Sequence, residues 1–210
     1  MTRQVRFFFG LGSRYSYLAS TQIAALEKDT GCAVAWLPMA SGALMAHRGQ
    51  NPFAARNAAG NWSGVSVSEQ YNEQYRRTDL VRWAKLYNVP YLEPLDPIMG
   101  GNRRTLYCVA AEMLGQSACY CAGMFKSMYV DNIATTEDDC LGLAREIGAD
   151  ADRLRELVES GAAERRHEEI IALALELKVF GVPSFVVDGE LFWGNDRLVL
   201  LRHYLKQTSC

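Results

Sequence analysis

The sequence lacks long apolar runs and carries no dense charge of one sign. No stretch approaches the roughly 18 to 20 consecutive apolar residues of a membrane-spanning helix, and residues 1–4 lead straight into a strand pattern without an export signal. We therefore expect a cytoplasmic protein with no membrane partner. The net charge of −2 over 210 residues gives no general attraction to phosphate backbones, which argues against a nucleic-acid partner.

Histidine and cysteine are present, but not in metal-binding or redox spacings. The three histidines stand alone, and the closest cysteines, Cys119 and Cys121, are separated by a single residue. That spacing suits neither a zinc site nor a redox Cys-x-x-Cys pair, and on a helix the two thiols would lie on opposite faces. We expect no metal and, in a reducing compartment, free thiols at all six cysteines: Cys32, Cys108, Cys119, Cys121, Cys140 and Cys210.

The chain is 49% hydrophobic and can bury a core, and its length suits one domain with an insertion or two closely associated domains. Alternating apolar residues predict a strand over 5–9, and apolar residues at steps of three and four predict one helix over 15–28. A second strand is predicted over 33–37. These elements form a βαβ unit, for which we expect a parallel strand pair and a right-handed crossover.

The middle of the chain predicts a long loop followed by helices. Residues 39–64 are rich in Gly, Asn, Ala and Ser, and loops of this length are usually functional. From about residue 68 to 161 the apolar periodicity is helical almost throughout. Thr136 with Asp139 resembles a capping box, and Asp150 can cap the helix that follows.

The strand pattern returns near the C-terminus. A helix is predicted over 162–178, and Asp188-Gly189 suits a two-residue type I′ turn between strands over 184–187 and 191–193. Asn195 or Asp196 is predicted to cap a final helix. We therefore expect an α/β domain of the pattern βαβ–αββα, built from residues 1–38 and 162–210. An all-helical insertion over 65–161 splits it, and the loop over 39–64 lies near the active site.

The tetrad Ser13-Arg14-Tyr15-Ser16 stands between the first predicted strand and the first predicted helix. Free backbone N–H groups and the helix dipole at such a position favour an anion. A serine cannot form a disulfide, but its hydroxyl can donate a hydrogen bond to a thiolate carried by another molecule. The alternative is that Ser13 acts only as a helix N-cap, which is the commonest role of serine before a helix.

Three parts of the sequence carry a resemblance to a known family: residues 7–19 (FFFGLGSRYSYLA), residues 75–90, and residues 178–184 (KVFGVPS) with 192–197 (FWGNDR). In this order they make the chain resemble the 2-hydroxychromene-2-carboxylate isomerases and the kappa-class glutathione transferases. These form a branch of the DsbA-like thioredoxin fold, which carries Cys-x-x-Cys where this chain has its tetrad. The resemblance covers nearly the whole chain and implies the same βαβ–αββα fold.

The resemblance implies glutathione as cofactor and assigns residues to it. Ser13 matches the serine that contacts the glutathione sulfur. The pair Val182-Pro183 matches the cis-proline loop of the family. The Val182 backbone could pair with the cysteinyl part of glutathione like an added strand. The segment that holds the γ-glutamyl end is matched by Trp193, Gly194, Asn195 and Asp196. Taken alone, Val182-Pro183 could be an ordinary turn and Asn195-Asp196 only a cap. Family members are commonly dimers, which implies a homodimer.

The substrate half departs from the family. Arg14 stands where the family usually has proline, and Gly10 where an acidic residue is common. The loop after the second strand is about a dozen residues longer, and the later segment over 94–97 lacks the usual tyrosine. In that loop, Asn51, Arg56 and Asn57 are the candidate substrate-binding residues, although Arg56 could equally be a solvated surface residue. Arginine suits a substrate carboxylate.

These observations favour a glutathione-dependent isomerase acting on a small aromatic unsaturated carbonyl or hemiketal acid. Two alternatives stay open: a kappa-type transferase that leaves the conjugate intact, and a redox-inactive module that binds glutathione or a peptide. A disulfide oxidoreductase is disfavoured because no cysteine occupies the tetrad.

Overall fold

The computed structural model describes residues 3–40, 42, 44, 73–94, 102–133 and 136–207. Its described part contains a four-stranded sheet in the order β2-β1-β3-β4. β1 runs parallel to β2 and antiparallel to β3, which confirms the predicted parallel pair of the βαβ unit. The strands are β1 (Gln4–Phe9), β2 (Ala33–Pro38), β3 (Ser184–Val187) and β4 (Glu190–Trp193).

β1 lies inside the sheet, and its side chains fill the core on both faces. Phe7, Phe8 and Phe9 are fully buried. The Phe7 ring stacks on Phe185 of β3 at 4.8 Å and meets Trp36 of β2 edge-on at 5.3 Å. Such aromatic contacts add to the burial of apolar area, so β1 is the element around which the layers assemble.

The prediction of a single helix over 15–28 is wrong. The chain forms α1 (Arg14–Ser20) and α2 (Ile23–Thr30), with a break at Thr21 and Gln22. Before the break, the Ser20 and Thr21 hydroxyls each donate to a backbone carbonyl three residues earlier, at 2.7 Å. Hydroxyl side chains that bond to nearby backbone groups compete with the helical ladder, which accounts for the interruption.

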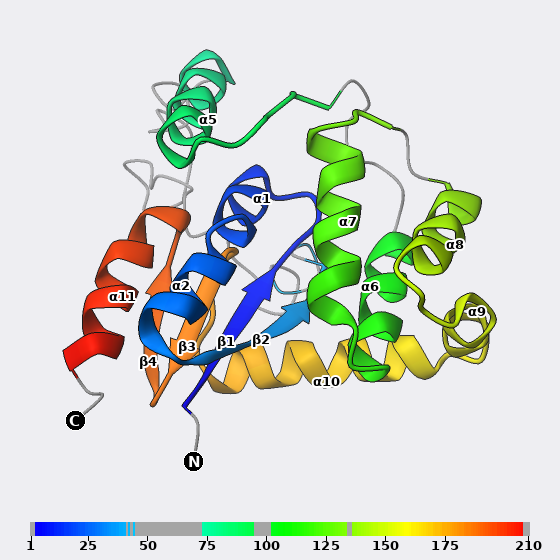
Figure 1. Cartoon of the computed structure of the whole chain (residues 1–210). Helices are drawn as coiled ribbons and strands as arrows, with labels where there is room; N and C mark the ends of the chain where they lie inside the picture. The colour runs from blue at the N-terminus through cyan, green and yellow to red at the C-terminus, as the bar shows by residue number, and fades with distance from the viewer. Residues whose placement is uncertain are drawn as a thin grey trace, which may run out of the picture.

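The helices predicted in the middle of the chain are present among the described residues. Thr136 and Asp139 form the predicted capping box of α8, and the Asp150 side chain accepts from Arg153 N at 2.9 Å to cap α9. Figure 1 shows α6 to α9 gathered beside the β2 edge of the sheet, with α10 running across its end. The helices are α5 (Glu73–Tyr87), α6 (Arg103–Met113), α7 (Ser117–Tyr129), α8 (Glu137–Glu146), α9 (Ala151–Glu159) and α10 (Ala162–Glu176).

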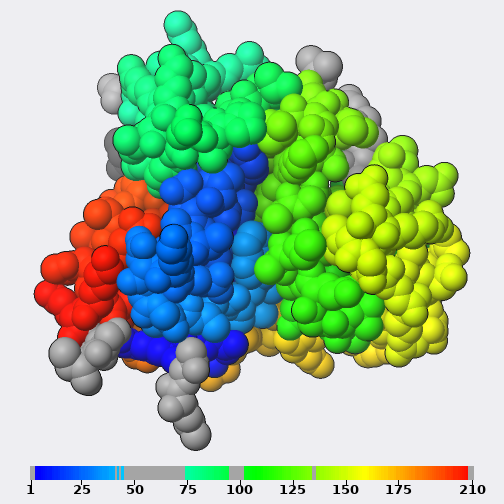
Figure 2. Space-filling model, viewed as in Figure 1, coloured from blue at the N-terminus to red at the C-terminus, as the bar shows by residue number. Residues whose placement is uncertain are grey.

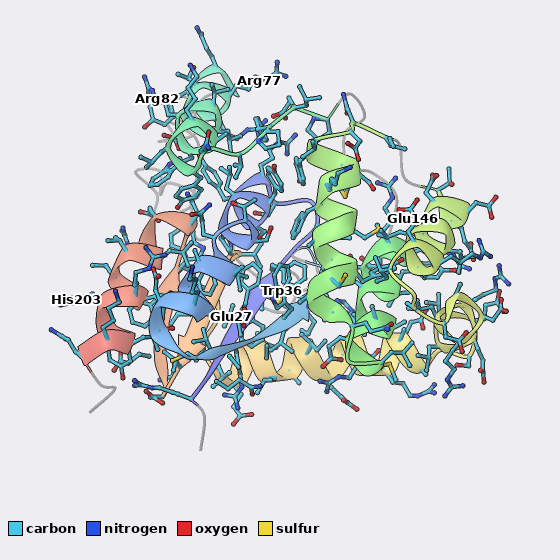
Figure 3. All side chains as sticks on the ribbon, viewed as in Figure 1. Glu27, Trp36, Arg77, Arg82, Glu146 and His203 are labelled. Atoms are coloured by element: carbon cyan, nitrogen blue, oxygen red, sulfur yellow. The ribbon has the colours of Figure 1, made fainter. Side chains whose placement is uncertain are left out.

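Trp36 joins the sheet to this helical part. Figure 3 shows it between the strands and α7, and the Ser117 hydroxyl at the start of α7 donates to its carbonyl oxygen at 2.9 Å. On α7, Cys121 is buried and Cys119 exposed, as expected for opposite helix faces. The five cysteines in the described residues are free; Cys210 lies outside them. The domain boundaries drawn from the sequence stay a prediction.

The C-terminal hairpin is confirmed, but the predicted cap after it is wrong. Asp188 and Gly189 have φ values of 52° and 83°, as a type I′ turn requires. The 3₁₀ turn η1 (Asn195–Arg197) precedes α11 (Leu198–Gln207), and neither Asn195 nor Asp196 makes a side-chain cap bond. Gly194 is the N-cap of η1, and its φ of 111° is a conformation that only glycine adopts readily.

No helix in the described residues is long and apolar enough to cross a membrane.

One buried polar contact joins α10 to the end of β2. His167 is 6% exposed, and its Nε2 accepts from the Ala40 N–H at 3.0 Å. Burial lowers the pKa of His167 below its ordinary value, with Glu168 and Glu164 acting in the opposite direction. The imidazole is therefore neutral and acts as an acceptor at neutral pH.

We expect His167 to make stability depend on pH. Below about pH 6.5 the unfolded state binds a proton at this histidine that the folded state resists, so the free energy of unfolding should fall as pH falls, by up to about 1.4 kcal/mol per pH unit. Urea unfolding at several pH values between about 5 and 7.5 measures the slope. His167→Gln should flatten it, whereas His203→Gln, on the exposed face of α11 (Figure 3), should not. An unchanged slope in His167→Gln would contradict the assignment.

Candidate active site

Ser13 lies at the N-terminus of α1, directly beyond the end of β1. Its Oγ accepts from the Ser16 N–H at 3.2 Å, so the N-cap interpretation is confirmed. The hydroxyl hydrogen is still able to donate to another group. α1 has no acidic residue in its first turn, so no carboxylate of its own offsets the positive end of the helix dipole. Ser16 is buried and accepts from Gly10 N–H at 3.4 Å, which is a structural role.

The loop before β3 reaches the same end of the sheet as Ser13. Phe8 of β1 is paired with Ser184 of β3, and because the strands are antiparallel, the chain after Phe9 and the chain before Ser184 emerge together. The Val182-Pro183 bond is cis, as the resemblance implies. Among the described residues, the Val182 backbone N–H and C=O have no hydrogen-bond partner. They are available to a ligand that pairs like a strand.

Residues 193–196 lie against this loop through the β3–β4 hairpin. Gly194 N–H donates to Pro183 O at 2.9 Å. The Trp193 indole packs on the ring of Phe180 at 5.0 Å and closes over Gly181, where an added Cβ would come within 2.7 Å of its Nε1. Trp193 and Gly194 therefore shape the loop around Val182.

Asp196 belongs to η1, which contacts α1. Its carboxylate is paired with Arg197 at 2.6 Å, and both side chains are about half exposed. Exposed ion pairs are worth little, so Asp196 can exchange this partner for a ligand at small cost. Asn195, in contrast, is 4% exposed and its side chain is turned inward.

Tyr87 of α5 fixes η1, and sequence reasoning missed it. Its hydroxyl donates to Asn195 O at 3.0 Å and lies 3.5 Å from Asn195 Nδ2. Burial raises the pKa of Tyr87, with the hydrogen bond to Asn195 opposing this. Because α5 also contacts α1, and Figure 2 shows it lying over α1, it spans both sides of the site. The only sign of this role in the sequence is that Tyr87 lies within residues 75–90, one of the segments that carry the family resemblance.

A buried charge cluster next to Ser13 was also missed. Arg14 Nε donates to Glu93 Oε1 at 2.7 Å, and its Nη2 contacts the same carboxylate. Arg76 Nη2 of α5 lies 3.4 Å from that oxygen, and the Tyr91 hydroxyl donates to the other one. Burial raises the pKa of Glu93, but the hydrogen bonds from Arg14 and Tyr91 outweigh it and hold the pKa below its usual value. No sequence pattern marked Glu93, because its partners are distant along the chain.

The structure does not bring all predicted site residues together. Ser13, Val182, Pro183 and residues 193–196 meet at one end of the sheet, whereas Asn51, Arg56 and Asn57 lie outside the described residues. Their predicted contact with a substrate therefore stays a prediction. Within the described ranges, no cluster of His, Cys, Asp or Glu could hold a metal ion.

Comparison with known proteins decides the family. The model of the DSBA-like thioredoxin domain matches residues 4–206 of this chain. The chain belongs to this family. Its match extends from the first strand to the last helix, so the whole sheet and the helical part belong to the DSBA-like domain.

Relatives of this DSBA-like protein place it nearer the isomerases. A 2-hydroxychromene-2-carboxylate isomerase from Sphingobium xenophagum is 30% identical over 98% of this chain and 99% of its own length. One from Pseudomonas sp. (strain C18) is 29% identical over 95% and 88%. The solved structure of such an isomerase superposes with a TM-score of 0.80 at 26% identity, covering 97% of this chain and 95% of that one.

More distant DSBA-like structures share only the fold. The cytosolic disulfide reductase DsbM from Pseudomonas aeruginosa, solved with GSH, gives a TM-score of 0.64 at 16% identity over 97% and 98% of the two chains. The fold and the recognised family are thus confirmed, and the relatives support an enzyme of the isomerase class.

We expect Tyr87→Phe to lower the free energy of unfolding by about 1 to 2 kcal/mol, because it leaves the buried Asn195 groups without their partner. Denaturant unfolding measures this. Tyr204→Phe is the matched control, since that hydroxyl lies 3.4 Å from Asp188 at the exposed surface and its loss should cost under about 0.5 kcal/mol. Equal effects of the two substitutions would show that Tyr87 does not hold η1.

Proposed function

We propose that this protein is a glutathione-dependent isomerase of the 2-hydroxychromene-2-carboxylate isomerase type. The observation that carries the proposal is the meeting of an N-cap serine, Ser13, with the Val182-Pro183 loop and the η1 turn that bears Asp196, at one end of the sheet. These three parts match the thiol, the peptide backbone and the γ-glutamyl amino group of glutathione.

Ser13 would hold the sulfur end. Its hydroxyl donates a hydrogen bond to the anion while its oxygen keeps the first turn of α1 in place. The positive end of the α1 dipole favours the thiolate over the thiol. A donor that is fixed before the anion forms stabilises it without reorganisation.

Val182 and Asp196 would hold the rest of the tripeptide. The Val182 N–H and C=O, which have no partner among the described residues, can pair with the cysteinyl backbone. The Asp196 carboxylate can take the γ-glutamyl ammonium in place of Arg197. The donor and acceptor set therefore fits the thiol, the cysteinyl backbone and the γ-glutamyl ammonium of glutathione.

When bound, glutathione supplies a thiolate nucleophile that adds reversibly to a conjugated double bond. We infer a small aromatic unsaturated carbonyl or hemiketal acid as substrate. The chain's own residues bind the sulfur at the end of the sheet, where Ser13 favours the deprotonated thiolate. Candidate substrate residues remain Asn51, Arg56 and Asn57. The resemblance further implies a homodimer.

A kappa-type transferase is the second candidate, because its glutathione residues would be the same. The two functions differ in what becomes of glutathione: an isomerase returns it unchanged, whereas a transferase consumes it. A redox-inactive binding module would bind glutathione without any turnover.

We expect the wild-type protein to convert 2-hydroxychromene-2-carboxylate to its open-chain isomer with full recovery of glutathione. Ser13→Ala should lower kcat by about 100-fold or more, because it removes the donor to the thiolate, while glutathione still binds. Chromatography of substrate, product and glutathione, with calorimetry of binding, measures both effects.

Ser20→Ala is the matched control for Ser13, because it removes a hydroxyl of the same helix that bonds only to Tyr17 O. Its kcat should equal that of the wild type. Loss of free glutathione in step with turnover would favour the transferase. An unchanged kcat in Ser13→Ala would remove Ser13 from the mechanism.

We expect Asp196→Asn to weaken glutathione binding by about 1.5 to 3 kcal/mol, because it removes a charge-assisted hydrogen bond to the ammonium group. The dipeptide Cys-Gly lacks the γ-glutamyl ammonium, and its own amino group lies at the cysteine, so its affinity should not change. Asp188→Asn, at the other end of β3, serves as the control. Calorimetry that finds the same loss for glutathione and for Cys-Gly would rule out this contact.

A further inference from the structure

The carbonyl groups on either side of Val182 are both hydrogen-bonded. The Gly181 carbonyl oxygen accepts from the Ser184 hydroxyl at 2.7 Å. The Pro183 carbonyl oxygen accepts from the Gly194 N–H at 2.9 Å. Among the described residues, the N–H and C=O of Val182 itself have no partner. The backbone of Val182 is therefore left open between two peptide groups that are fixed.

Ser184 is held by the sheet rather than by the loop. It is the first residue of β3, where it is paired with Phe8 of β1 and with Trp193 of β4. Ser184 is fully buried. A buried hydroxyl needs a hydrogen-bond partner, and the Gly181 carbonyl is the partner that it has. This bond fixes the loop to the end of the sheet.

The bond from Ser184 sets the direction of the Val182 N–H. The Gly181 C=O and the Val182 N–H belong to one planar peptide group, and in a trans peptide they point in opposite directions. Because the Gly181 oxygen points to the buried Ser184 hydroxyl, the Val182 N–H points away from it. The Val182 side chain is half-buried and packs against the core, so the residue cannot turn freely about its own bonds.

The Trp193 indole is a second restraint on the same peptide group. The φ of Gly181 lies outside the left-handed region, so its backbone does not itself demand glycine. An added Cβ, however, would lie 2.7 Å from Trp193 Nε1 and 3.3 Å from Cε2. The indole also packs on the ring of Phe180 at 5.0 Å. Glycine is therefore required at 181 by the space that the indole occupies.

We propose that Ser184 is a positioning residue for glutathione: its hydroxyl fixes the peptide group that bears the Val182 N–H, and Trp193 packed on Gly181 keeps that group in place. This rests on the proposed function, in which Val182 pairs with the cysteinyl backbone. The Val182 N–H donates to the cysteinyl carbonyl, and the Val182 carbonyl accepts from the cysteinyl N–H. Groups that are oriented beforehand bind without a further loss of conformational entropy.

The rival explanation is that Ser184 only stabilises the end of β3. The two explanations differ in what the loss of the hydroxyl changes. A purely structural role predicts a lower melting temperature with unchanged affinity of the folded protein for glutathione. A positioning role predicts weaker glutathione binding with little change in kcat once glutathione is saturating.

The experiment compares Ser184→Ala with Ser117→Ala by calorimetry with glutathione and by isomerase kinetics. Ser117 is the matched control, because it too is buried and donates to a backbone carbonyl, Trp36 O at 2.9 Å, but on the β2 side of the sheet. Both variants should have a lower melting temperature than the wild type.

We expect Ser184→Ala to raise the Kd and the KM for glutathione about 10-fold and to change kcat by less than about 2-fold. Ser117→Ala should keep the wild-type Kd. An unchanged Kd in Ser184→Ala, or an equal rise in both variants, would overturn the inference.

A second pair of variants tests the restraint from Trp193. Gly181→Ala should also raise the Kd for glutathione, because the new methyl group and the indole cannot both keep their places. Trp193→Leu removes Nε1 and Cε2, so the double variant should bind glutathione more tightly than Gly181→Ala alone. If the two changes simply multiply, Trp193 does not restrain Gly181, and that half of the inference is wrong.

A measurement without glutathione separates this inference from the proposed function. In protein labelled with ¹⁵N-valine, the order parameter of the Val182 amide should fall from about 0.85 in the wild type to below about 0.6 in Ser184→Ala. It should not fall in Ser117→Ala. An equally rigid Val182 amide in Ser184→Ala would overturn the inference. If the wild type fails to bind glutathione while Ser184→Ala still loosens Val182, the fixed peptide group stands and only the proposed function fails.

Discussion

The antiparallel pairing of β1 with β3 is the constraint on which the site depends. It places the turn after β1 and the loop before β3 at one end of the sheet, although Ser13 and Pro183 are far apart in the sequence. The β3–β4 hairpin then returns the chain to the same end, where Gly194 bonds to Pro183. A shift of one residue in the β1–β3 register would move each phenylalanine of β1 to the opposite face of the sheet and break the stacking of Phe7 on Phe185. Core packing therefore protects the geometry of the site.

The electrostatics of the site come from two sources of different range. The α1 N-terminus acts within its first turn, and the ion pairs of Arg14 and Arg76 with Glu93 lie beside three stacked tyrosines. Arg14 stands where the resembling family usually has proline, and its side chain bonds to Glu93. Glu93 keeps the partly buried Arg14 guanidinium from being left unpaired, which would be costly.

Family membership and site chemistry address different questions. The DSBA-like fold is shared with disulfide enzymes, and fold alone does not fix function. What separates this chain from them is a hydroxyl at Ser13 in place of a redox thiol, while the described cysteines lie elsewhere. The relatives that match at about 30% identity over nearly the whole chain are named isomerases. In the proposed function a thiolate attacks and leaves, and Ser13 would stabilise it without reacting itself.

The sequence by itself determined the features whose causes are local. The Asp188-Gly189 turn, the Thr136–Asp139 capping box and the Asp150 cap depend on neighbouring residues, so their spacing predicted them correctly. Only the tertiary structure decided the break at Thr21 and the replacement of an Asn195 cap by Gly194, because competing local hydrogen bonds have similar energies and packing selects among them. It also decided the partners of Glu93 and Tyr87, which come from separate helices and loops and leave no periodic signal in the sequence.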